Sequence, residues 1–496
     1  MIPRGWRSGW VLAALICLCA RASSAESPGF PIDLQAVPVG SPRVLDLDGD
    51  EDDDVIAATR DGRVFVFSKQ GASFPGAPVD LSQLLGQAVT LSAPPAFGDL
   101  DESGTFRMVL VTDDGTLAVL RADLSLELAQ SLGADALTTP VVAQSREGAR
   151  LIVLSVDGAL HVLDATGAKT NGSPLQLPSG TWAPAVAVAD VDRDGVLDVA
   201  LARVGDDGHA YATRVTLGTS PEVAAGWPVD LGPATRVLPP VVADFDGDGQ
   251  SELVFGAEGQ LPVVLRASGD PAIALADVPV GNAPAVLMAA ADLDGDGTAE
   301  LLCAVDDGLA AFAVGTQLRR NRQLTPLPAP MRDGFPIDAA QVAQSGPAVA
   351  DVAGDSDRDL IVSTGDAVTV RSRFGAEALG WPQPAGAPLA GAVAVGAQRD
   401  VMVIAAVSED GVLHLWDGVG QPQHVAWDGF QHDPGNTGAL STPLPPRTVH
   451  PISGGGGAPP KEQGCCQGSI GGFELSALSA LLVLGRLRLR GRLRRR

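Results

Sequence analysis

Four short segments of the chain place carboxylate side chains at the same four positions of a nine-residue stretch. The segments are residues 46–54, 190–198, 244–252 and 292–300, and each has Asp or Glu at positions 1, 3, 5 and 9. Carboxylates this close repel one another unless a cation lies among them. Calcium is a hard cation that binds about six to eight oxygen ligands, and alternate residues of a loop can point several oxygens at one ion. The spacing therefore predicts one bound calcium ion in each loop.

The predicted ligands are the four carboxylates of each loop and the backbone carbonyl of position 7, where the side chain varies. The ligand residues are Asp46, Asp48, Asp50, Asp52 and Asp54; Asp190, Asp192, Asp194, Val196 and Asp198; Asp244, Asp246, Asp248, Gln250 and Glu252; and Asp292, Asp294, Asp296, Thr298 and Glu300. The loops are not EF-hands, because that motif needs a bidentate Glu at position 12. The twelfth residues here are apolar and already belong to the next predicted strand.

Other copies depart from this pattern. Residues 351–359 have Ala353 at position 3, so the remaining aspartates predict at most a weak fifth site. Residues 99–107 end in Arg107, whose cation opposes a metal, and the equivalent segments near residues 144 and 396 have lost the ligands. One acidic turn alone can equally be solvated without a metal. The identical spacing in four loops favours calcium.

The acidic loops belong to a longer repeat. A charged residue followed by an apolar run recurs eight times at intervals of 41 to 59 residues, beginning at residues 54, 107, 150, 198, 252, 300, 359 and 400. A turn, mostly Asp-Gly or Glu-Gly, and a second apolar segment follow, which is typical of a β-hairpin. Such small sheets must stack on copies of themselves. The pattern predicts an all-β fold, a β-propeller of about eight blades, or seven if the terminal units share one blade. A parallel solenoid is the competing repeat fold, but it lacks hairpin turns.

A proline-containing marker punctuates the units. It reads GFPIDL at residue 29, GWPVDL at residue 226 and GFPIDA at residue 334, with three variants elsewhere. Because proline cannot donate a hydrogen bond to a central strand, these segments are expected at the outer edges of blades or in the connections between them.

A D-x-D-x-D-x-x-x-[D/E] loop between two strands, repeated at this spacing, resembles the FG-GAP/VCBS repeats of the integrin α-subunit head. The resemblance covers about residues 29–440. It implies a β-propeller whose loops bind calcium between the strands of a blade, and we extend that implication only to the four complete loops. We place the propeller domain at residues 26–445.

The N-terminus predicts export. Arg4 and Arg7 precede an apolar stretch, and small residues end at Ala25, which indicates a signal peptide over residues 1–25.

The C-terminus predicts attachment to the cell surface. A Pro/Gly-rich linker (446–466) ends in Cys465 and Cys466, and a short apolar stretch with seven arginines follows (467–496). These features resemble MYXO-CTERM sorting tails, which implies that the tail is clipped and that one of the two cysteines is the attachment point. A plain membrane anchor is the alternative.

The predicted mature chain is strongly acidic. Removing the signal and the segment after Cys466 takes away ten of 34 basic residues and one of 59 acidic ones, which leaves a net charge of −34. Nucleic acid is therefore an unsuitable partner, since phosphates need a basic surface. Cys303 is the one cysteine left in the body, so it forms no internal disulfide there and is expected to be a buried, inert thiol.

The sequence favours a binding protein over an enzyme. The six histidines lack metal-ligand spacing, no nucleophile elbow is present, and His161 and His414 occupy equivalent strand positions that indicate packing. The segment AWDGFQHDPGNTG (426–438) is expected to complete or cap the ring, although His432 and Asp433 could instead form a surface site. We expect a non-enzymatic module that binds an extracellular protein or glycan. The alternative is a secreted polysaccharide lyase or hydrolase.

Overall fold

The computed structural model describes residues 26–245, 248–258, 260–273, 288–305, 308–313, 331–338, 346–398, 401–420 and 424–444. All of them belong to one compact unit, Met1–His450. The predicted signal peptide, linker and C-terminal tail lie outside the described residues. Among the described residues, no helix is long and apolar enough to cross a membrane.

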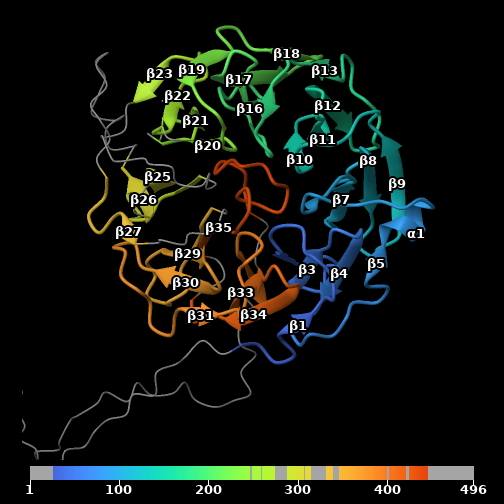
Figure 1. The fold of residues 1–496 in the computed structure, drawn as a ribbon, viewed down its shortest axis with the longest axis vertical. Coiled ribbons are helices and arrows are strands. Elements are labelled where there is room, and N and C mark those ends of the chain that lie inside the picture. Colours follow the sequence, from blue (N-terminus) through green and yellow to red (C-terminus); the bar gives the residue numbers. More distant parts are fainter. Residues whose placement is uncertain are drawn as a thin grey trace, which may run out of the picture. The chain divides into compact units, whose positions relative to one another are not determined.

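The described strands form eight antiparallel sheets arranged as the blades of a propeller (Figure 1). Each blade runs from its first strand, on the inner side of the ring, to its fourth strand at the rim, and in blade 7 one further strand lies inside the first (Figure 1). Blade 1 consists of β2 (Arg43–Leu45), β3 (Asp54–Ala58), β4 (Arg63–Phe67) and β5 (Val79–Asp80), which the short helix α1 (Leu81–Leu85) follows. Blade 2 consists of β6 (Ala96–Gly98), β7 (Arg107–Val111), β8 (Thr116–Leu120) and β9 (Leu126–Ser131). Blade 3 consists of β10 (Val141–Ser145), β11 (Gly148–Leu154), β12 (Ala159–Asp164) and β13 (Leu175–Gln176).

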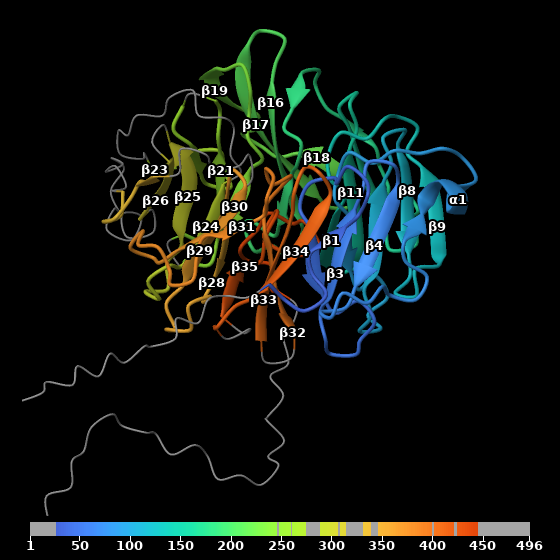
Figure 2. The same cartoon turned by 60° about the horizontal axis from the view of Figure 1, so that its bottom comes forward.

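Blade 4 is the largest, because both its first and its fourth strand are divided in two, and it stands above its neighbours in Figure 2. It consists of β14 (Thr181–Trp182), β15 (Ala187–Ala189), β16 (Asp198–Val204), β17 (His209–Leu217), β18 (Pro221–Val223) and β19 (Val229–Pro233). Blade 5 consists of β20 (Val241–Ala243), β21 (Glu252–Phe255), β22 (Val263–Leu265) and β23 (Pro271–Ile273). Blade 6 consists of β24 (Ala289–Ala291), β25 (Glu300–Val305), β26 (Gly308–Phe312) and β27 (Ile337–Asp338).

The last two blades contain strands from distant parts of the chain. Blade 7 consists of β28 (Ala348–Ala350), β29 (Asp359–Thr364), β30 (Ala367–Arg371) and β31 (Gln383–Pro384), with β35 (Val425–Trp427) added beside β28. Blade 8 consists of β32 (Ala394–Gln398), β33 (Val401–Val407), β34 (Val412–Asp417) and, at the rim, β1 (Ile32–Asp33) from the N-terminus.

The N-terminal strand closes the ring. β1 pairs antiparallel with β34, with Ile32 opposite Leu413. The two ends of the domain therefore share one blade, as the seven-blade alternative assumed. The count is nevertheless eight, because the N-terminal segment contributes a single rim strand to blade 8 and the first complete unit begins only at β2.

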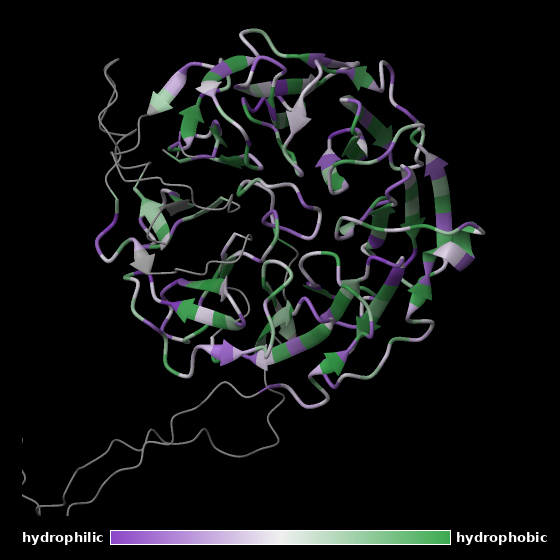
Figure 3. Ribbon diagram, viewed as in Figure 1, coloured by the Kyte–Doolittle hydropathy of each residue, from purple (hydrophilic) through white to green (hydrophobic). Residues whose placement is uncertain are grey.

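The eight apolar runs of the sequence are the second strands of the eight blades. Both faces of such a strand are covered by neighbouring blades, so it reads as a continuous apolar run instead of alternating with polar residues (Figure 3). In β3, Val55 packs with Val403 of blade 8, whereas Ile56 packs with Met108 of blade 2. Successive side chains of a strand point to opposite faces, and the hydrophobic core therefore consists of layers between adjacent blades.

The proline marker forms the rim, as predicted. In each of its six copies the X-Pro bond is cis and a fourth strand follows at once: β1, β5, β13, β19, β27 and β31. In four copies the glycine of the marker packs against the next blade: Gly29, Gly172, Gly226 and Gly334. At Gly226, for example, an added Cβ would lie 2.6 Å from the backbone oxygen of Ser268 in blade 5. Only glycine allows this approach.

The segment that follows β35 fills the centre of the ring (Figure 1). Backbone N–H groups of five first strands donate to its carbonyl oxygens, for example Phe97 to Pro434 at 2.7 Å and Val188 to Thr437 at 2.7 Å. The other three donors are Val142, Val242 and Val395. The prediction that this segment completes the ring agrees with these contacts. His432 and Asp433 are only 1% and 3% exposed and do not form a surface site.

Candidate metal centres

The four predicted calcium loops occupy the same place in four blades. Each connects the first strand to the second, in blades 1, 4, 5 and 6. The second strand begins at position 9 of the loop, and in blade 6 the carboxylate at that position, Glu300, comes within 4.8 Å of those of Asp292 and Asp294.

The carboxylate at position 1 holds the bend of each loop. Asp46 accepts hydrogen bonds from the N–H groups of Gly49 (2.7 Å) and Glu51 (3.0 Å). Asp292 accepts the equivalent bonds from Gly295 (2.7 Å) and Gly297 (3.0 Å). At the far side of the bend, the N–H of position 7 donates to the carboxylate at position 5 in all four loops, as from Asp52 to Asp50 at 2.9 Å. Backbone N–H groups thus hold carboxylate oxygens of the predicted calcium ligands at positions 1 and 5 in place.

The carboxylate at position 9 is buried and bonded to the start of its own loop. In blade 6, Leu293 N–H donates to Glu300 Oε2 at 2.8 Å. The same bond from position 2 to position 9 occurs in all five loops of the acidic type, including residues 351–359. The exposed fraction at position 9 runs from 1% to 8% over Asp54, Asp198, Glu252, Glu300 and Asp359.

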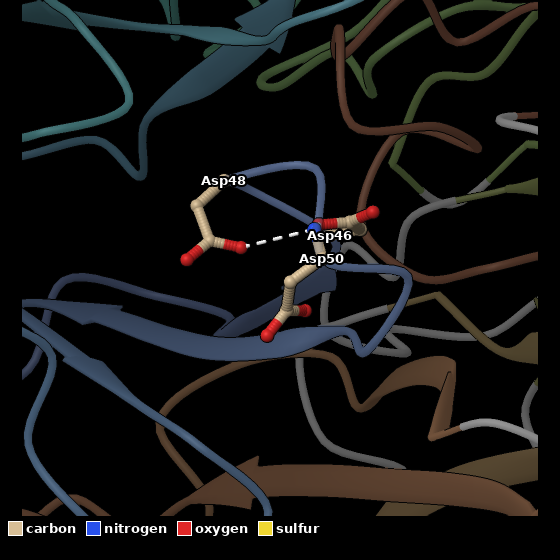
Figure 4. Close-up of side chains that lie close together, drawn as sticks. All are labelled: Asp46, Asp48 and Asp50. Carbon is tan, nitrogen blue, oxygen red and sulfur yellow. Dashed lines mark hydrogen bonds between the residues drawn. The ribbon is translucent and has the colours of Figure 1, made fainter.

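Three groups of carboxylates come close enough to share one ion. In each group, one oxygen per residue lies within 4.8 Å of the others. The groups are Asp46, Asp48 and Asp50; Asp190, Asp192 and Asp194; and Asp292, Asp294 and Glu300. Figure 4 shows the first group, in which the Asp50 N–H donates to Asp48 at 3.2 Å. These distances suit a calcium ion, whose oxygen ligands lie at about 2.3–2.6 Å from the metal.

Burial works against the charge of the carboxylates at position 9. It raises the pKa of Asp54 to about 8, and the nearby charge of Asp48 adds to the effect. It raises the pKa of Glu300 to about 7 and that of Asp359 to about 6. A raised pKa means that the ionised group is destabilised where it stands, and a bound cation would remove that destabilisation.

The carboxylates at positions 1, 3, 5 and 9 of loop 46–54 have no basic partner within the part of the chain that the structure describes. Among the described residues, Asp46, Asp48, Asp50 and Asp54 form no ion pair. The donor set of this loop therefore fits a divalent cation.

Loop 190–198 has an arginine inside it. Arg214 on β17 donates through Nη2 to Asp192 and, at 2.9 Å, to Asp198. Two oxygens of the loop, Asp190 Oδ1 and Asp192 Oδ1, are buried without a hydrogen-bond partner among the described residues. The loop thus combines an internal cation with unsatisfied oxygens.

Loop 292–300 has an arginine in the same place. Arg332 forms an ion pair with Asp294 at 2.8 Å and another with Glu300. Arg358, from the acidic loop of blade 7, lies 3.6 Å from Asp292.

Loop 244–252 is described in part, since Asp246 lies outside the described residues. Asp244 accepts the Gly249 N–H at 2.9 Å, and Glu252 accepts the Phe245 N–H at 3.0 Å. The part that the structure describes therefore has the same backbone bonds as the other three loops.

The two departing loops differ from each other. In residues 99–107 the guanidinium of Arg107 pairs with Asp101 and with Glu127, both at 2.8 Å, so a cation of the protein already occupies this loop. In residues 351–359, Asp359 Oδ1 is buried without a partner among the described residues, and His424 lies 3.4 Å from Asp351. The predicted weak fifth site stays a prediction.

The cysteine and the two histidines that the sequence assigned to packing are buried. Cys303 is 1% exposed, and burial raises the pKa of its thiol to about 12, as expected for an inert thiol. His161 lies 3.2 Å from Ser155, and His414 stacks on Trp416 with ring centroids 5.2 Å apart. Both histidines pack inside their blades.

Sequence reasoning missed the arginines at the acidic loops. Arg214 lies 16 positions after Asp198, and Arg332 lies 32 positions after Glu300. No local spacing connects these residues. A second feature that sequence reasoning missed lies in the hairpin turns, and it has a sequence signal. Ser or Thr stands two residues before Asp-Gly, and its hydroxyl donates to that Asp, at residues 59, 112, 155 and 408.

Two hollows accompany blade 4. The larger, about 470 Å³, lies beside loop 190–198 and is lined by Asp192, Asp194, Arg214, Gln250 and Arg266 among others. The smaller, about 350 Å³, is lined by residues that include Glu147, Arg150 and Asp164. Both linings mix acidic and basic groups.

The comparisons with known proteins agree with this architecture in one segment. Residues 244–303, which contain two of the acidic loops, match the family described as FG-GAP-like repeat. No curated protein sequence matches the chain. The wider resemblance over residues 29–440 stays a prediction.

Several solved structures resemble the chain at low identity. BBS1N, from its complex with ARL6DN, is 13% identical with a TM-score of 0.45, over 81% of this chain and 99% of that chain. BamB from Moraxella catarrhalis is 15% identical with a TM-score of 0.48, over 79% and 100%. The V. cholerae biofilm matrix protein Bap1 is 12% identical with a TM-score of 0.48, over 82% and 94%. Similarities of this size do not extend to function. The chain is an eight-bladed β-propeller with an FG-GAP-like repeat at residues 244–303.

Proposed function

We propose that the chain is an exported, surface-attached calcium-binding propeller that acts as a non-enzymatic binding module for an extracellular protein or glycan. Loop 46–54 carries the proposal. It gathers three carboxylates within 4.8 Å of one another, beside a buried fourth whose pKa is raised to about 8, with no ion pair to any of them among the described residues. Calcium is the cation that suits such an all-oxygen site.

Calcium would act as a structural clamp. The acidic loops also hold blades together, because Asp53 N–H donates to Ala397 of blade 8 at 3.2 Å and Ser251 N–H donates to Val191 of blade 4 at 2.8 Å. An ion that fixes the loop therefore also fixes a contact between blades. A site filled at 100 times its dissociation constant would stabilise the fold by about 2.7 kcal/mol.

The filled centre of the ring favours binding over catalysis. A propeller surrounds a central channel, and here residues 428–440 fill that position with their backbone bonded to the first strands. The broad rims and loop-bearing faces are then the surfaces on which a partner can dock. Export and attachment rest on the predicted signal peptide and on the tail with Cys465 and Cys466.

The test of calcium binding compares the purified protein with two variants. D48N removes a carboxylate from loop 46–54, and D135N removes an exposed carboxylate outside the loops. We expect the wild type and D135N to contain bound calcium and to melt at a higher temperature in CaCl₂ than in EDTA. D48N should lose one ion. Equal metal content in D48N and the wild type would contradict this site.

The test of the binding function profiles the protein against glycans and cell-envelope proteins, in CaCl₂ and in EDTA. The proposal expects a partner whose binding weakens in chelator, with no polymer consumed. Turnover of a polysaccharide would instead support the lyase or hydrolase alternative.

A further inference from the structure

Three loops of the ring contain a guanidinium beside the carboxylate at position 3, although the arginines come from three different places in the chain. Arg107 is position 9 of its own loop, Arg214 lies on β17, and Arg332 precedes β27. Their ion pairs join Arg107 to Asp101, Arg214 to Asp192 and Arg332 to Asp294. The same arrangement reached from three positions indicates that a cation is needed at this point of the loop.

Two of these arginines also donate a hydrogen bond to the carboxylate at position 9. Both oxygens of Asp198 are taken, Oδ1 by the Thr216 hydroxyl and Oδ2 by Arg214, each at 2.9 Å. In blade 6, Leu293 N–H donates to Glu300 Oε2, and Arg332 donates to Glu300 Oε1. In blade 1, by contrast, Asp54 accepts one bond, from Leu47 to Oδ2, and Oδ1 has no partner among the described residues. Of these three carboxylates, Asp54 is the one with an oxygen that accepts no hydrogen bond among the described residues.

The strand positions explain why the arginines reach only some loops. Arg214 lies opposite Ala200, two residues after position 9 of its loop. The equivalent residue of blade 1 is Val66, opposite Ile56, and it is fully buried. In blade 6 it is Ala311, whose carbonyl accepts the Arg332 N–H at 2.8 Å. The small side chain of Ala311 leaves room for Arg332 to enter from the neighbouring segment.

We propose that Arg214 and Arg332 are internal competitors of calcium, so that the acidic loops form two classes. Loop 46–54 needs the metal to close. Loops 190–198 and 292–300 keep their shape without it and bind calcium at least about tenfold more weakly, because the ion must displace or share its ligands with a guanidinium. Binding is weakened and not abolished, since Asp190 Oδ1 and Asp192 Oδ1 have no hydrogen-bond partner within the described parts of the chain. This inference rests on the proposed calcium binding of loop 46–54.

Hydrogen exchange of the wild-type full-length protein tests the two classes without any substitution. Amides of residues 46–54 should exchange much faster in EDTA than in CaCl₂. Amides of 190–198 and 292–300 should stay protected in EDTA and change little when micromolar calcium is added. Equal deprotection of all three loops in EDTA would overturn the inference.

Calcium titration of two variants tests the arginines directly. R214Q and R332Q remove a guanidinium from inside a loop, whereas the control R63Q removes one that pairs with Asp61, at 2.8 Å, outside the acidic loops. We expect R214Q and R332Q each to gain at least about tenfold in affinity at one site, with R63Q unchanged.

The outcomes separate this inference from the proposed function. If the wild type binds calcium in loop 46–54 but R214Q and R332Q titrate as the wild type does, the inference fails alone. If no calcium binds to the wild type or to D48N, the proposed function fails and the inference fails with it.

Discussion

The buried carboxylate of Asp54 accepts a hydrogen bond from the backbone N–H of Leu47, at 3.4 Å, across the loop that joins β2 to β3. The bond fixes one oxygen of the carboxylate, and the charges of Asp48, Asp50 and Asp46 each raise the pKa of Asp54. An arrangement that buries a carboxylate next to three others is stable only when a proton or a cation is present.

The variant D54N should show this directly. The amide keeps the oxygen that accepts the Leu47 N–H but carries no charge, so in EDTA at pH 8 the variant should be more stable than the wild type by about 2 kcal/mol. In CaCl₂ the order should reverse, because the ion loses a charged ligand. Urea unfolding under both conditions measures the two differences. A variant less stable than the wild type in EDTA would show that the charge of Asp54 is already compensated.

The pH dependence in EDTA follows from the same carboxyl group. The pKa of Asp54 is about 8 in the fold, against an ordinary value of 3.8. A group with a raised folded-state pKa binds its proton more tightly in the fold, so its stabilising effect is complete below pH 3.8 and disappears as the pH rises through about 8. We expect the stability of the wild type, relative to D54N, to fall between pH 5 and pH 8.5 in EDTA. A difference that does not change over this range would contradict the raised pKa.

The marker glycine Gly226 should be needed for contact between blades and not only for its backbone angle. Gly226 and Gly76 both have φ +89°, but a Cβ at Gly226 would lie 2.6 Å from the Ser268 oxygen, whereas nothing lies within 4 Å at Gly76. Gly76→Ala should cost about 1 kcal/mol through the backbone alone. Gly226→Ala should cost about 1–3 kcal/mol more. Chemical unfolding of both variants checks the difference, and equal costs would mean that the contact with blade 5 does not matter.

The segment that fills the centre should be needed for stability. Buried Asn436 accepts a hydrogen bond from Arg43 of blade 1 and donates to the carbonyls of Pro95 (3.3 Å) and Pro140 (3.0 Å), next to blades 2 and 3. Asn436→Ala leaves a buried guanidinium and two carbonyls short of a partner and should cost about 2–4 kcal/mol. Asn171→Ala, at an exposed asparagine, should stay within about 0.5 kcal/mol. Thermal unfolding of the two variants tests this, and a small effect at Asn436 would mean that the segment is dispensable.

The sequence predicts the fold well because each blade is a local structure. The apolar runs, the Asp-Gly turns and the proline marker all act within one unit, and so do the carboxylates of loop 46–54, which lie within nine residues of chain. Their places in the propeller follow directly from spacing.

The features that the sequence did not predict depend on contacts between distant residues. Nothing near Asp198 or Glu300 shows that Arg214 or Arg332 will lie beside it, because strand pairing decides which side chain reaches the loop. The closing strand β1 and the bond between Arg43 and Asn436 likewise join opposite ends of the domain. Whether an arginine lies inside an acidic loop can therefore be learned only from the folded structure, and not from the sequence near the loop.

The most direct measurement is the calcium content of the purified protein together with its unfolding temperature in EDTA and in millimolar CaCl₂. The account predicts bound calcium, at least one ion of which is lost in D48N, and a higher unfolding temperature when calcium is present. A protein that contains no metal and unfolds at the same temperature in both buffers would contradict it.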